Sequence, residues 1–260
     1  MWIGEDEGGD EMIKNMMAKR GRRGRKDLKK PIRIVAASDL HGVVSLEQLN
    51  LEGVDICILA GDIAPLKGVN LIGKLEQEAW VLDVFIPFMR KHKGTEFVFI
   101  AGNHDFWGLR MMPNSKEWPK NAHYMKNSHC EVKGLRFYGM PDVPYINGVW
   151  AFESRCGDVD MASAMIPSGL DVLVTHTPPF ISGSSIDTSE GVFLVNGEES
   201  HFGSFALADA VIRTKPKYLF CGHIHTGSHA CCELGETKCF NVSLLNESYR
   251  MSYMPLDVEI

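Results

Sequence analysis

Clusters of aspartate, asparagine and histidine follow five apolar segments of this sequence. Carboxylate, amide and imidazole groups are oxygen and nitrogen ligands suited to Mn²⁺, Fe or Zn²⁺, and the clusters contain no thiolate that would select a soft structural site. Neither GNH nor GHxH is expected even once by chance in a chain of this composition. In chain order the clusters are Asp39-Leu40-His41, Gly61-Asp62, Gly102-Asn103-His104-Asp105, His176 and Gly222-His223-Ile224-His225.

The charges of these groups indicate what a metal site built from them would do. Asp39 and Asp62 are anionic, whereas Asn103 and neutral histidines add no charge. Two divalent cations would leave a charge of about +2, or about +1 with a bridging hydroxide. Such a site attracts and polarises phosphate and lowers the pKa of bound water towards neutrality, and the cations of two-metal sites lie about 3.5–4 Å apart.

Short apolar runs predict the elements that position these groups. Runs rich in Val, Ile and Phe and bounded by Gly, Asp or Pro are typical of buried strands. The clusters come directly after such runs, at the strand ends where ligands collect in α/β sheets. The predicted strands are Ile32–Ala37, Val54–Ala60, Phe97–Ala101, Leu135–Met140, Val172–Val174, Tyr218–Cys221 and Phe240–Val242.

Helical spacing appears between some of these strands. One pattern is formed by Leu75, Ala79, Leu82, Ile86 and Met89. Pro87 should kink that helix or begin a new one. A second helix is predicted from Ser204, a good N-cap, to about Thr214, with three inward residues: Phe205, Ala208 and Ile212. Strands that alternate with helices indicate an α/β layered domain.

Two long segments are predicted as loops, residues 106–128 and 180–202. Loops of this length are uncommon in compact domains and often serve as lids or binding loops. Three aromatic residues of the first loop could stack on a base or aryl group, or could equally pack the loop onto the body: Trp107, Trp118 and Tyr124. Among the histidines outside the clusters, His201 and His229 are the best candidates to approach the site.

The series DxH, GD, GNHD, H and GHxH resembles the calcineurin-like metallophosphoesterase superfamily over about residues 32–250. The resemblance implies an α/β fold of four layers, in which helices flank two packed mixed β-sheets. It implies that seven residues bind two metals: Asp39, His41 and His225 the first, Asn103, His176 and His223 the second, with Asp62 bridging. His104 resembles the family's non-ligand histidine, which protonates the leaving oxygen, and Asn103 and His104 would contact the substrate.

Several shorter stretches are similar to the branch called metallophosphoesterase-domain-containing proteins: 138–141, 150–152, 166–167, 171–179 and 241–243. Related branches hydrolyse phosphodiesters, including cyclic nucleotides. The resemblance therefore implies a metal-dependent hydrolase, first of all a phosphodiesterase acting on a small or cyclic-nucleotide-type diester. A metal-bound hydroxide would attack phosphorus, with His104 as the general acid. Two divalent ions are the expected cofactors, with Mn²⁺ ahead of Fe or Zn²⁺.

One departure weakens the likeness to protein phosphatases. Those members carry Asp-Arg-Gly shortly after the GD motif, whereas Asp62 is followed here by Ile63-Ala64-Pro65. The arginine that grips a phosphomonoester is missing there, and so is the aspartate that orients the catalytic histidine. Asp105 is adjacent to His104, but a neighbouring side chain usually points elsewhere. A phosphomonoesterase is therefore the second reading, followed by a nuclease and a non-catalytic interaction module.

Charge is distributed unevenly along the 260 residues. Residues 1–30 carry a net charge of +3 and eight basic residues between Lys19 and Lys30, which predicts a flexible tail or a polyanion-binding arm. Residues 31–260 carry a net charge of −9 and are expected to form one catalytic domain. An acidic body disfavours nucleic acid as a partner and favours a small phosphate ester.

The sequence also bears on location. It contains no run of about 18 apolar residues, so a membrane-spanning helix is not expected. Its first residues are acidic, where a secretory signal would begin with basic residues. The seven cysteines are an odd number without a CxxC pair, which favours free thiols in a reducing compartment. A cytoplasmic protein is therefore predicted, and its oligomeric state is left open.

Overall fold

The computed structural model describes residues 30–67, 69–154, 159–188, 200–227 and 229–260. By their contacts, Ile32–Ile260 form one compact unit. The predicted basic tail lies outside the described residues except for Lys30. The division between a tail and a catalytic domain therefore stays a prediction.

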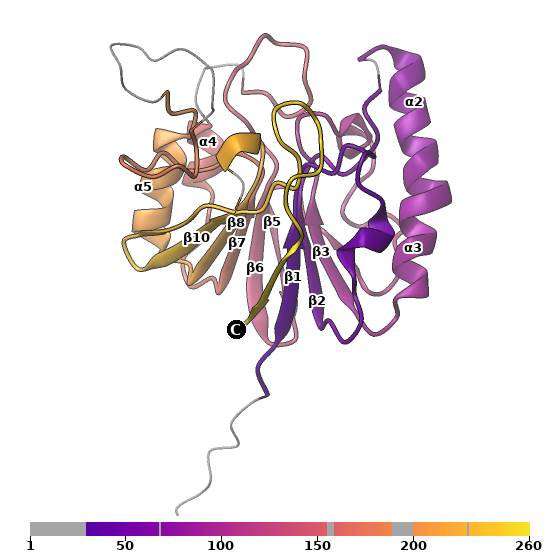
Figure 1. The fold of residues 1–260 in the computed structure, drawn as a ribbon, viewed down its shortest axis with the longest axis horizontal. Helices are drawn as coiled ribbons and strands as arrows, with labels where there is room; N and C mark the ends of the chain where they lie inside the picture. The colour runs from indigo at the N-terminus through magenta and orange to yellow at the C-terminus, as the bar shows by residue number, and fades with distance from the viewer. Residues whose placement is uncertain (1–29, 68, 155–158, 189–199, 228) are drawn as a thin grey trace, which may run out of the picture. The chain divides into compact units, whose positions relative to one another are not determined.

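The first sheet has five strands in the order β11-β1-β2-β3-β4. Figure 1 labels its neighbouring strands β1, β2 and β3. Their bounds are β1 Arg33–Ala37, β2 Ile56–Ala60, β3 Glu96–Ile100, β4 Ala122–Tyr124 and β11 Leu256–Glu259. The four strands β1 to β4 run parallel, and β11 pairs with β1 antiparallel. All residues of β2 are buried, as expected for a central strand covered on both faces.

The second sheet has six strands in the order β5-β6-β7-β8-β10-β9. Their bounds are β5 Ser128–Val132, β6 Leu135–Met140, β7 Val172–Thr175, β8 Tyr218–Cys221, β9 Cys231–Leu234 and β10 Thr237–Asn241. The inner strands β6, β7, β8 and β10 are parallel, and the edge strands β5 and β9 are antiparallel to their neighbours. Both sheets are therefore mixed.

Side-chain alternation along the strands assigns the layers. Ile34 and Ala36 of β1 pack with Val172 and Val174 of β7 in a core between the two sheets. The intervening Val35 and Ala37 belong to a second core, on the helix-covered side of the first sheet. A third core covers the outer face of the second sheet. The four-layer α/β fold expected from the sequence is confirmed.

Helices α2 (Leu71–Trp80) and α3 (Ile86–Lys91) cover the first sheet and are joined by a π-helical segment, η2 (Val81–Phe85) (Figure 1). The backbone stays helical from α2 through η2 into α3, and Pro87 lies in the first turn of α3. The sequence predicted a kink or a new helix at Pro87. The structure has a π-helical segment just before it, in which the Ile86 N–H bonds to the Val81 carbonyl five residues back. Helix α2 buries Gln77 rather than the exposed Leu75, which becomes important at the site.

Helices α4 (Asp160–Ala164) and α5 (Phe205–Thr214) cover the second sheet. Ser204 caps α5 as predicted, because its hydroxyl accepts the Leu207 N–H. The predicted inward face of α5 is wrong: Phe205 is 63% exposed and Ile212 is 47% exposed. The helix instead buries a second face with helical spacing, formed by Leu207, Ala210, Val211 and Thr214.

The strands that the sequence pattern missed are all at or near sheet edges. In β5, β9 and β11 exposed or half-buried residues alternate, so these strands lack a continuous apolar run. The predicted loop 106–128 contains the 3-10 helix η3 (Phe106–Leu109), strand β4 and the start of β5, so that prediction is wrong. Of the predicted loop 180–202, residues 189–199 lie outside the described residues.

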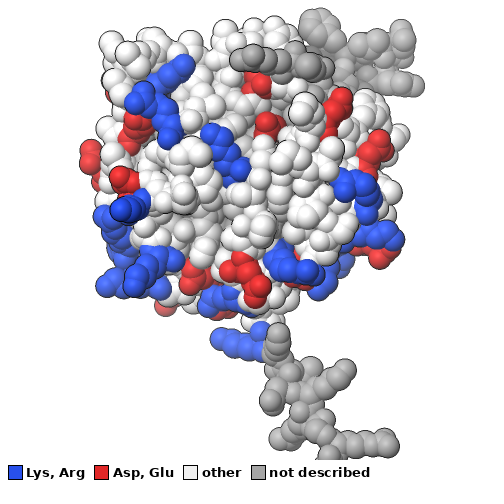
Figure 2. All heavy atoms as spheres, turned by 180° about the vertical axis from the view of Figure 1, so that it is seen from behind, with Lys and Arg blue, Asp and Glu red and all other residues white. Residues whose placement is uncertain are grey.

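Acidic and basic side chains are interspersed over the described surface that Figure 2 shows, and neither sign forms a continuous track there. Among the described residues, no helix has the length and apolar character needed to cross a bilayer.

Candidate metal centre

Every predicted ligand lies on a turn that follows the carboxyl end of a parallel strand. The first sheet supplies four of them, after β1, β2 and β3: Asp39, His41, Asp62 and Asn103. The second sheet supplies three, after β7 and β8: His176, His223 and His225, where His225 opens the short 3-10 helix η4 (His225–Gly227). Contacts between these turns join the two sheet edges into one site.

One group of ligand atoms is formed by Asp39, His41 and His225, whose donor atoms all lie within 4.8 Å of one another. The Oδ1 atom of Asp39 is 3.5 Å from Nε2 of His225 and 3.8 Å from Nε2 of His41. All three residues are buried. This is the set that the sequence assigned to the first metal.

A second group is formed by Asp39, Asp62 and His176, again within 4.8 Å. Nε2 of His176 lies 3.3 Å from Oδ2 of Asp62 and 3.0 Å from Oδ1 of Asn103. The same Oδ2 atom of Asp62 is 3.6 Å from Nε2 of His41. Asp62 therefore lies between the two groups.

His223 lies at the edge of the centre rather than within either group. Its ring centroid is 5.1 Å from that of His176, and its backbone N–H donates to Oδ2 of Asp39 over 3.0 Å. His223 is partly exposed, whereas His176 is fully buried. Asp39 also belongs to the second group, with Asp62 and His176. The sequence did not predict that contact.

Glycines make room for the carboxylates. A Cβ atom added at Gly102 would overlap Oδ1 of Asp62, and one added at Gly222 would overlap Oδ2 of Asp39 and the hydroxyl of Ser38. The glycines of the GNHD and GHxH clusters are therefore required by close packing around the ligands.

The backbone is strained at four of the predicted ligands. Asp39, His41, Asp62 and His223 have positive φ angles of 56°, 49°, 52° and 70°. A non-glycine residue in the left-handed region costs about 1 kcal/mol or more, and such residues cluster at functional sites. The surrounding hydrogen bonds must hold these turns, and the strained turns aim the side chains at one point.

Within the candidate centre, three buried polar atoms lack hydrogen-bond partners among the described residues: Oδ1 of Asp39 and both ring nitrogens of His41. Buried polar atoms are normally paired, because an unpaired one costs about 1–3 kcal/mol. A cation that accepts the lone pairs of Asp39 Oδ1 and of one His41 ring nitrogen would satisfy two of them. The donor set therefore fits a divalent metal.

The outer contacts fix which atoms face the centre. Nδ1 of His176 lies 2.9 Å from the Ala60 carbonyl, and Nδ1 of His225 lies 3.1 Å from the Asn246 carbonyl. These contacts leave Nε2 of each ring directed at the carboxylates. Ser243 donates its hydroxyl proton to Oδ2 of Asp39 over 2.6 Å. The carbonyl contacts orient the two imidazoles and raise their basicity, and the Ser243 hydroxyl orients the Asp39 carboxylate.

The electrostatics separate the four histidines of the centre into two pairs. Burial lowers the pKa of His41 to about 4 and that of His223 to about 3. Burial also lowers the pKa of His176 and His225, but the carboxylates of Asp62 and Asp39 outweigh it and raise each pKa to about 9. In the absence of a cation, protons therefore occupy the Nε2 atoms that face Asp39 and Asp62.

Asp39 and Asp62 are held as anions. Burial raises the pKa of each carboxyl group, but the neighbouring imidazoles outweigh burial and hold both pKa values well below their usual range. The main opposing groups are His225 at Asp39 and His176 at Asp62. Two ionised carboxylates in a buried cluster form a strongly attractive site for cations.

His104 lies beside the ligand groups without joining them. Its backbone N–H donates to Oδ1 of Asp62 over 2.8 Å, and its ring centroid is 4.8 Å from that of His41. The other side of the ring contacts Trp150, with centroids 4.3 Å apart. The partly exposed imidazole is therefore adjacent to the candidate centre, where it can reach a bound ester.

Asp105 does not orient the ring of His104. Its carboxylate accepts backbone N–H groups from Ile63, Ala64 and Gly102 over 2.9–3.0 Å and so ties the turn after β2 to the turn after β3. Gln77 of α2 donates to the His104 carbonyl over 2.8 Å and accepts the Phe106 N–H over 2.8 Å. These contacts fix the backbone of His104, and Trp150 packs against its ring.

The sequence did not predict that Trp150 and Tyr249 lie at the site. Tyr249 has a φ of 54°, and its ring centroid lies 5.1 Å from that of His41 and 5.2 Å from that of His225. Both aromatic residues stand in loops without a metal-ligand pattern. Only the likeness around residues 150–152 pointed to the Trp150 segment at all.

Other predicted candidates lie elsewhere. Trp107 is fully buried and packs with Phe99, Trp118 and Tyr124, so these aromatic residues belong to the core rather than to a stacking surface. His201 pairs with Asp187 over 2.9 Å, and His229 stacks on Tyr253. Neither histidine belongs to a candidate ligand group of the described residues.

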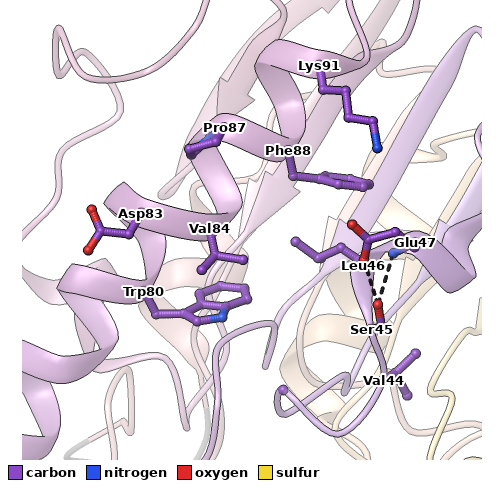
Figure 3. A pocket seen from close by; sticks show the side chains of 11 residues that line it. Val44, Ser45, Leu46, Glu47, Trp80, Asp83, Val84, Pro87, Phe88 and Lys91 are labelled. Atoms are coloured by element: carbon purple, nitrogen blue, oxygen red, sulfur yellow. Dashed lines mark hydrogen bonds between the residues drawn. The ribbon is translucent and has the colours of Figure 1, made fainter.

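A groove of about 380 Å³ lies between the 3-10 helix η1 (Leu46–Leu49) and the helical segment of α2, η2 and α3. Trp80 and Phe88 face Leu46 across it (Figure 3). None of the predicted ligands lines this groove, so it is separate from the candidate centre.

Sequence relatives match most of this chain. UPF0046 protein C25E10.12 of Caenorhabditis elegans is 28% identical over 249 residues, which cover 88% of this chain and 81% of that protein. Metallophosphoesterase domain-containing protein 1 of Homo sapiens is 26% identical over 253 residues, which cover 88% and 71%. UPF0046 protein T07D4.2 of Caenorhabditis elegans is 33% identical over 149 residues, 56% of this chain but only 35% of that protein.

The fold has matches of its own. One crystal structure superposes with a TM-score of 0.57 at 14% identity and covers 82% of this chain and 90% of that chain, which supports the fold alone. The model of the calcineurin-like phosphoesterase family matches residues 32–227, a span that contains all seven predicted ligands and His104. This chain therefore belongs to the calcineurin-like phosphoesterase family.

Proposed function

We propose that this protein is a hydrolase of phosphate esters that depends on two divalent metal ions. The observation that carries the proposal is the pair of overlapping ligand groups, with the unpaired Oδ1 of Asp39 and the unpaired ring of His41 at their junction. Asp39, His41 and His225 would hold one ion. Asn103, His176 and His223 would hold the other, with Asp62 between them. Mn²⁺ is the first candidate, followed by Fe and Zn²⁺.

Divalent cations at such a site supply phosphate polarisation and an activated water. The side chains of this protein would supply orientation and a proton. Asp62 accepts the backbone N–H of His104, so one carboxylate links the ligand groups to the proton donor. The partly exposed imidazole of His104 would contact the phosphate together with Asn103 and donate a proton to the leaving oxygen.

We favour a small or cyclic-nucleotide-type diester as the substrate. The segment after Asp62 supports this choice, because Ile63-Ala64-Pro65-Leu66-Lys67 contains no arginine to grip a second phosphate charge. The backbone N–H groups of Ile63 and Ala64 are bound by Asp105 and so are not available to a phosphomonoester. The interspersed charges in Figure 2 offer no continuous basic track for a long polyanion on that face of the described residues.

We also propose that the protein works in a reducing compartment such as the cytoplasm. Six cysteines of the described residues are free thiols, and three of them are buried.

The test assays the full chain with three substrates, once with Mn²⁺ and once with EDTA. The substrates are bis(4-nitrophenyl) phosphate, 4-nitrophenyl phosphate and a cyclic nucleotide. We expect Mn²⁺-dependent turnover with the diester hydrolysed faster than the monoester. Asp62→Asn should lose bound metal and activity together, whereas His104→Ala should keep its metal and lose about 100-fold or more in turnover. Faster monoester hydrolysis would support a phosphomonoesterase, and metal binding without turnover would support a non-catalytic role.

A further inference from the structure

A second cavity, of about 340 Å³, opens directly beside the candidate centre. Its apolar wall is formed by Tyr145, Ile146, Phe202 and Ile224, and its polar wall by His223 and Glu247. His223 is a candidate ligand, and Ile224 is the next residue of the same turn. The cavity is therefore continuous with the predicted site of phosphate binding.

The apolar wall is solvent-exposed although it borders a highly polar centre. Tyr145 is 54% exposed, Ile146 45% and Phe202 39%. Clustered apolar side chains at the mouth of a polar site are typical of a pocket for the organic part of a ligand. Phe202 belongs to the predicted loop 180–202, so the far end of that loop does reach the site.

Hydrogen bonds pre-form the loop that carries Tyr145 and Ile146. One oxygen of Glu153, Oε1, accepts the backbone N–H groups of Ile146, Asn147 and Gly148 over 2.6–3.1 Å. Its other oxygen, Oε2, accepts the N–H of Trp150 over 2.8 Å. A carboxylate that binds four N–H groups fixes the loop before any ligand arrives, which lowers the entropic cost of binding.

The same loop contacts the centre at two places, at His104 and at His223. Trp150 packs against His104, the proposed proton donor, whereas Tyr145 and Ile146 line the cavity at His223. Ala151 donates its N–H to the Asn103 carbonyl over 3.0 Å and so anchors the loop to the turn after β3. A leaving group at His104 would therefore place the other arm of a diester at His223.

The chemistry of the walls defines what the cavity would accept. Apolar and aromatic side chains favour a flat organic group through area burial and ring contacts. The carboxylate of Glu247, which also lines the cavity, disfavours a second phosphate. A volume of about 340 Å³ is enough for one aromatic ring system.

We propose that this cavity is the specificity pocket of the site and binds an aromatic group on the part of the ester that stays attached to phosphorus, such as an aryl ring or the nucleobase of a nucleoside. The inference rests on the proposed function. It adds the class of substrate: a diester with a single phosphoryl group whose retained arm is aromatic.

The test compares two esters that share the leaving group and differ in the retained arm, phenyl 4-nitrophenyl phosphate and methyl 4-nitrophenyl phosphate. The Mn²⁺-loaded full chain should prefer the phenyl ester in kcat/KM by about 10-fold or more. Ile146→Ser and Phe202→Ser should each lower that preference at least about five-fold. Ile212→Ser on α5 is the matched control, because Ile212 is 47% exposed and lies outside the cavity, and it should leave the preference unchanged.

Binding provides a readout that does not depend on turnover. Calorimetric titration of the Mn²⁺-loaded protein should show phenylphosphonate binding about 10-fold more tightly than methylphosphonate, a difference that Ile146→Ser reduces. An unchanged ester preference in both cavity variants, or equal affinity for the two phosphonates, would overturn the pocket assignment. Tight phenylphosphonate binding without hydrolysis of either ester would support the pocket and contradict the proposed hydrolase activity.

Discussion

At the scale of single residues, Asp39 is the point where the two ligand groups meet. Its Oδ2 atom accepts hydrogen bonds from Ser243 and from the His223 backbone, while Oδ1 faces His41 and His225 without a hydrogen-bond partner. The resemblance assigned Asp39 to one metal and the bridging role to Asp62. In the structure Asp39 belongs to both groups, whereas Asp62 belongs to the second and its Oδ2 atom lies 3.6 Å from Nε2 of His41 in the first.

Removal of the Ser243 hydroxyl should loosen Asp39. Ser243→Ala is expected to weaken Mn²⁺ binding about 10–100-fold, because outer contacts hold the carboxylate in its ligand orientation. Thr237→Val is the matched control, since it removes a buried hydroxyl that also donates over 2.6 Å, to the Pro216 carbonyl. Metal titration monitored by calorimetry checks the result, and equal affinity in both variants would contradict it.

The close approach of Gly222 to Asp39 leads to a second prediction. Gly222→Ala should lower the free energy of unfolding by about 1–3 kcal/mol and weaken metal binding, because the added methyl group forces the carboxylate or the backbone to move. Gly94→Ala is the control, because a Cβ atom there meets nothing within 4 Å. Urea unfolding with EDTA separates the stability effect from the effect on the metal.

The sequence could predict that these candidate ligands lie at strand ends, because each follows a strand that hydropathy itself predicts. It could not predict Trp150, Tyr249 or Ser243, whose contacts with the centre depend on how distant loops return to it. Nor could it identify Gln77, because a buried glutamine at helical spacing has the same polarity as an exposed one.

At the scale of elements, the side chain of Glu153 binds four backbone N–H groups of the loop from Tyr145 to Glu153. Burial raises the pKa of Glu153, but the four backbone N–H groups outweigh it and lower the pKa below its usual range. The carboxylate is therefore ionised at neutral pH, and its bonds are of the stronger, charge-assisted type.

Glu153→Gln should relax this loop without unfolding the protein. The substituted amide places an N–H₂ group against one set of backbone donors, so we expect turnover to fall about five-fold or more. The melting temperature should change little, as for other partly exposed positions. Glu236→Gln, which removes an exposed partner of Lys215, is the control and should retain full turnover. Equal activity of the two variants would show that the loop does not position Trp150.

The apolar runs predicted the seven strands that carry or flank the site, because central strands are buried on both faces and read as continuous hydrophobic segments. They could not reveal β5, β9 or β11, where polar residues alternate at the sheet edge. The predicted buried face of α5 was wrong for a related reason. Two apolar stripes of this helix have helical spacing, and tertiary packing buries the one with Leu207 and Val211 and leaves Phe205 and Ile212 exposed.

At the scale of the whole molecule, the protonation of His176 and His225 links the centre to stability. Each has a pKa raised to about 9 by the carboxylates it faces, against about 6.5 in an unfolded chain. A raised pKa contributes stability that is complete below about pH 6.5 and is lost as the pH rises towards 9.

The metal-free protein should therefore lose at least about 1 kcal/mol of unfolding free energy between pH 6.5 and pH 8.5. With Mn²⁺ present, the cation takes the place of these protons, so the loss should be smaller or reversed. Urea unfolding under anaerobic conditions at the two pH values, with EDTA and with Mn²⁺, measures the change in stability of the metal-free and the metal-bound protein. A metal-free protein whose stability rises over this range would contradict the assignment.

The division of the ligands between the two sheets has a mechanical consequence. Asp39 and Asp62 come from one sheet and His176 and His225 from the other, so ions bound among them would act as a cross-link between the two halves of the sandwich. Sliding of one half against the other would break coordination before either half lost its own strands. Release of the ions would therefore be an early event of denaturation, and a saturating supply of ions would slow denaturation as well as oppose it at equilibrium.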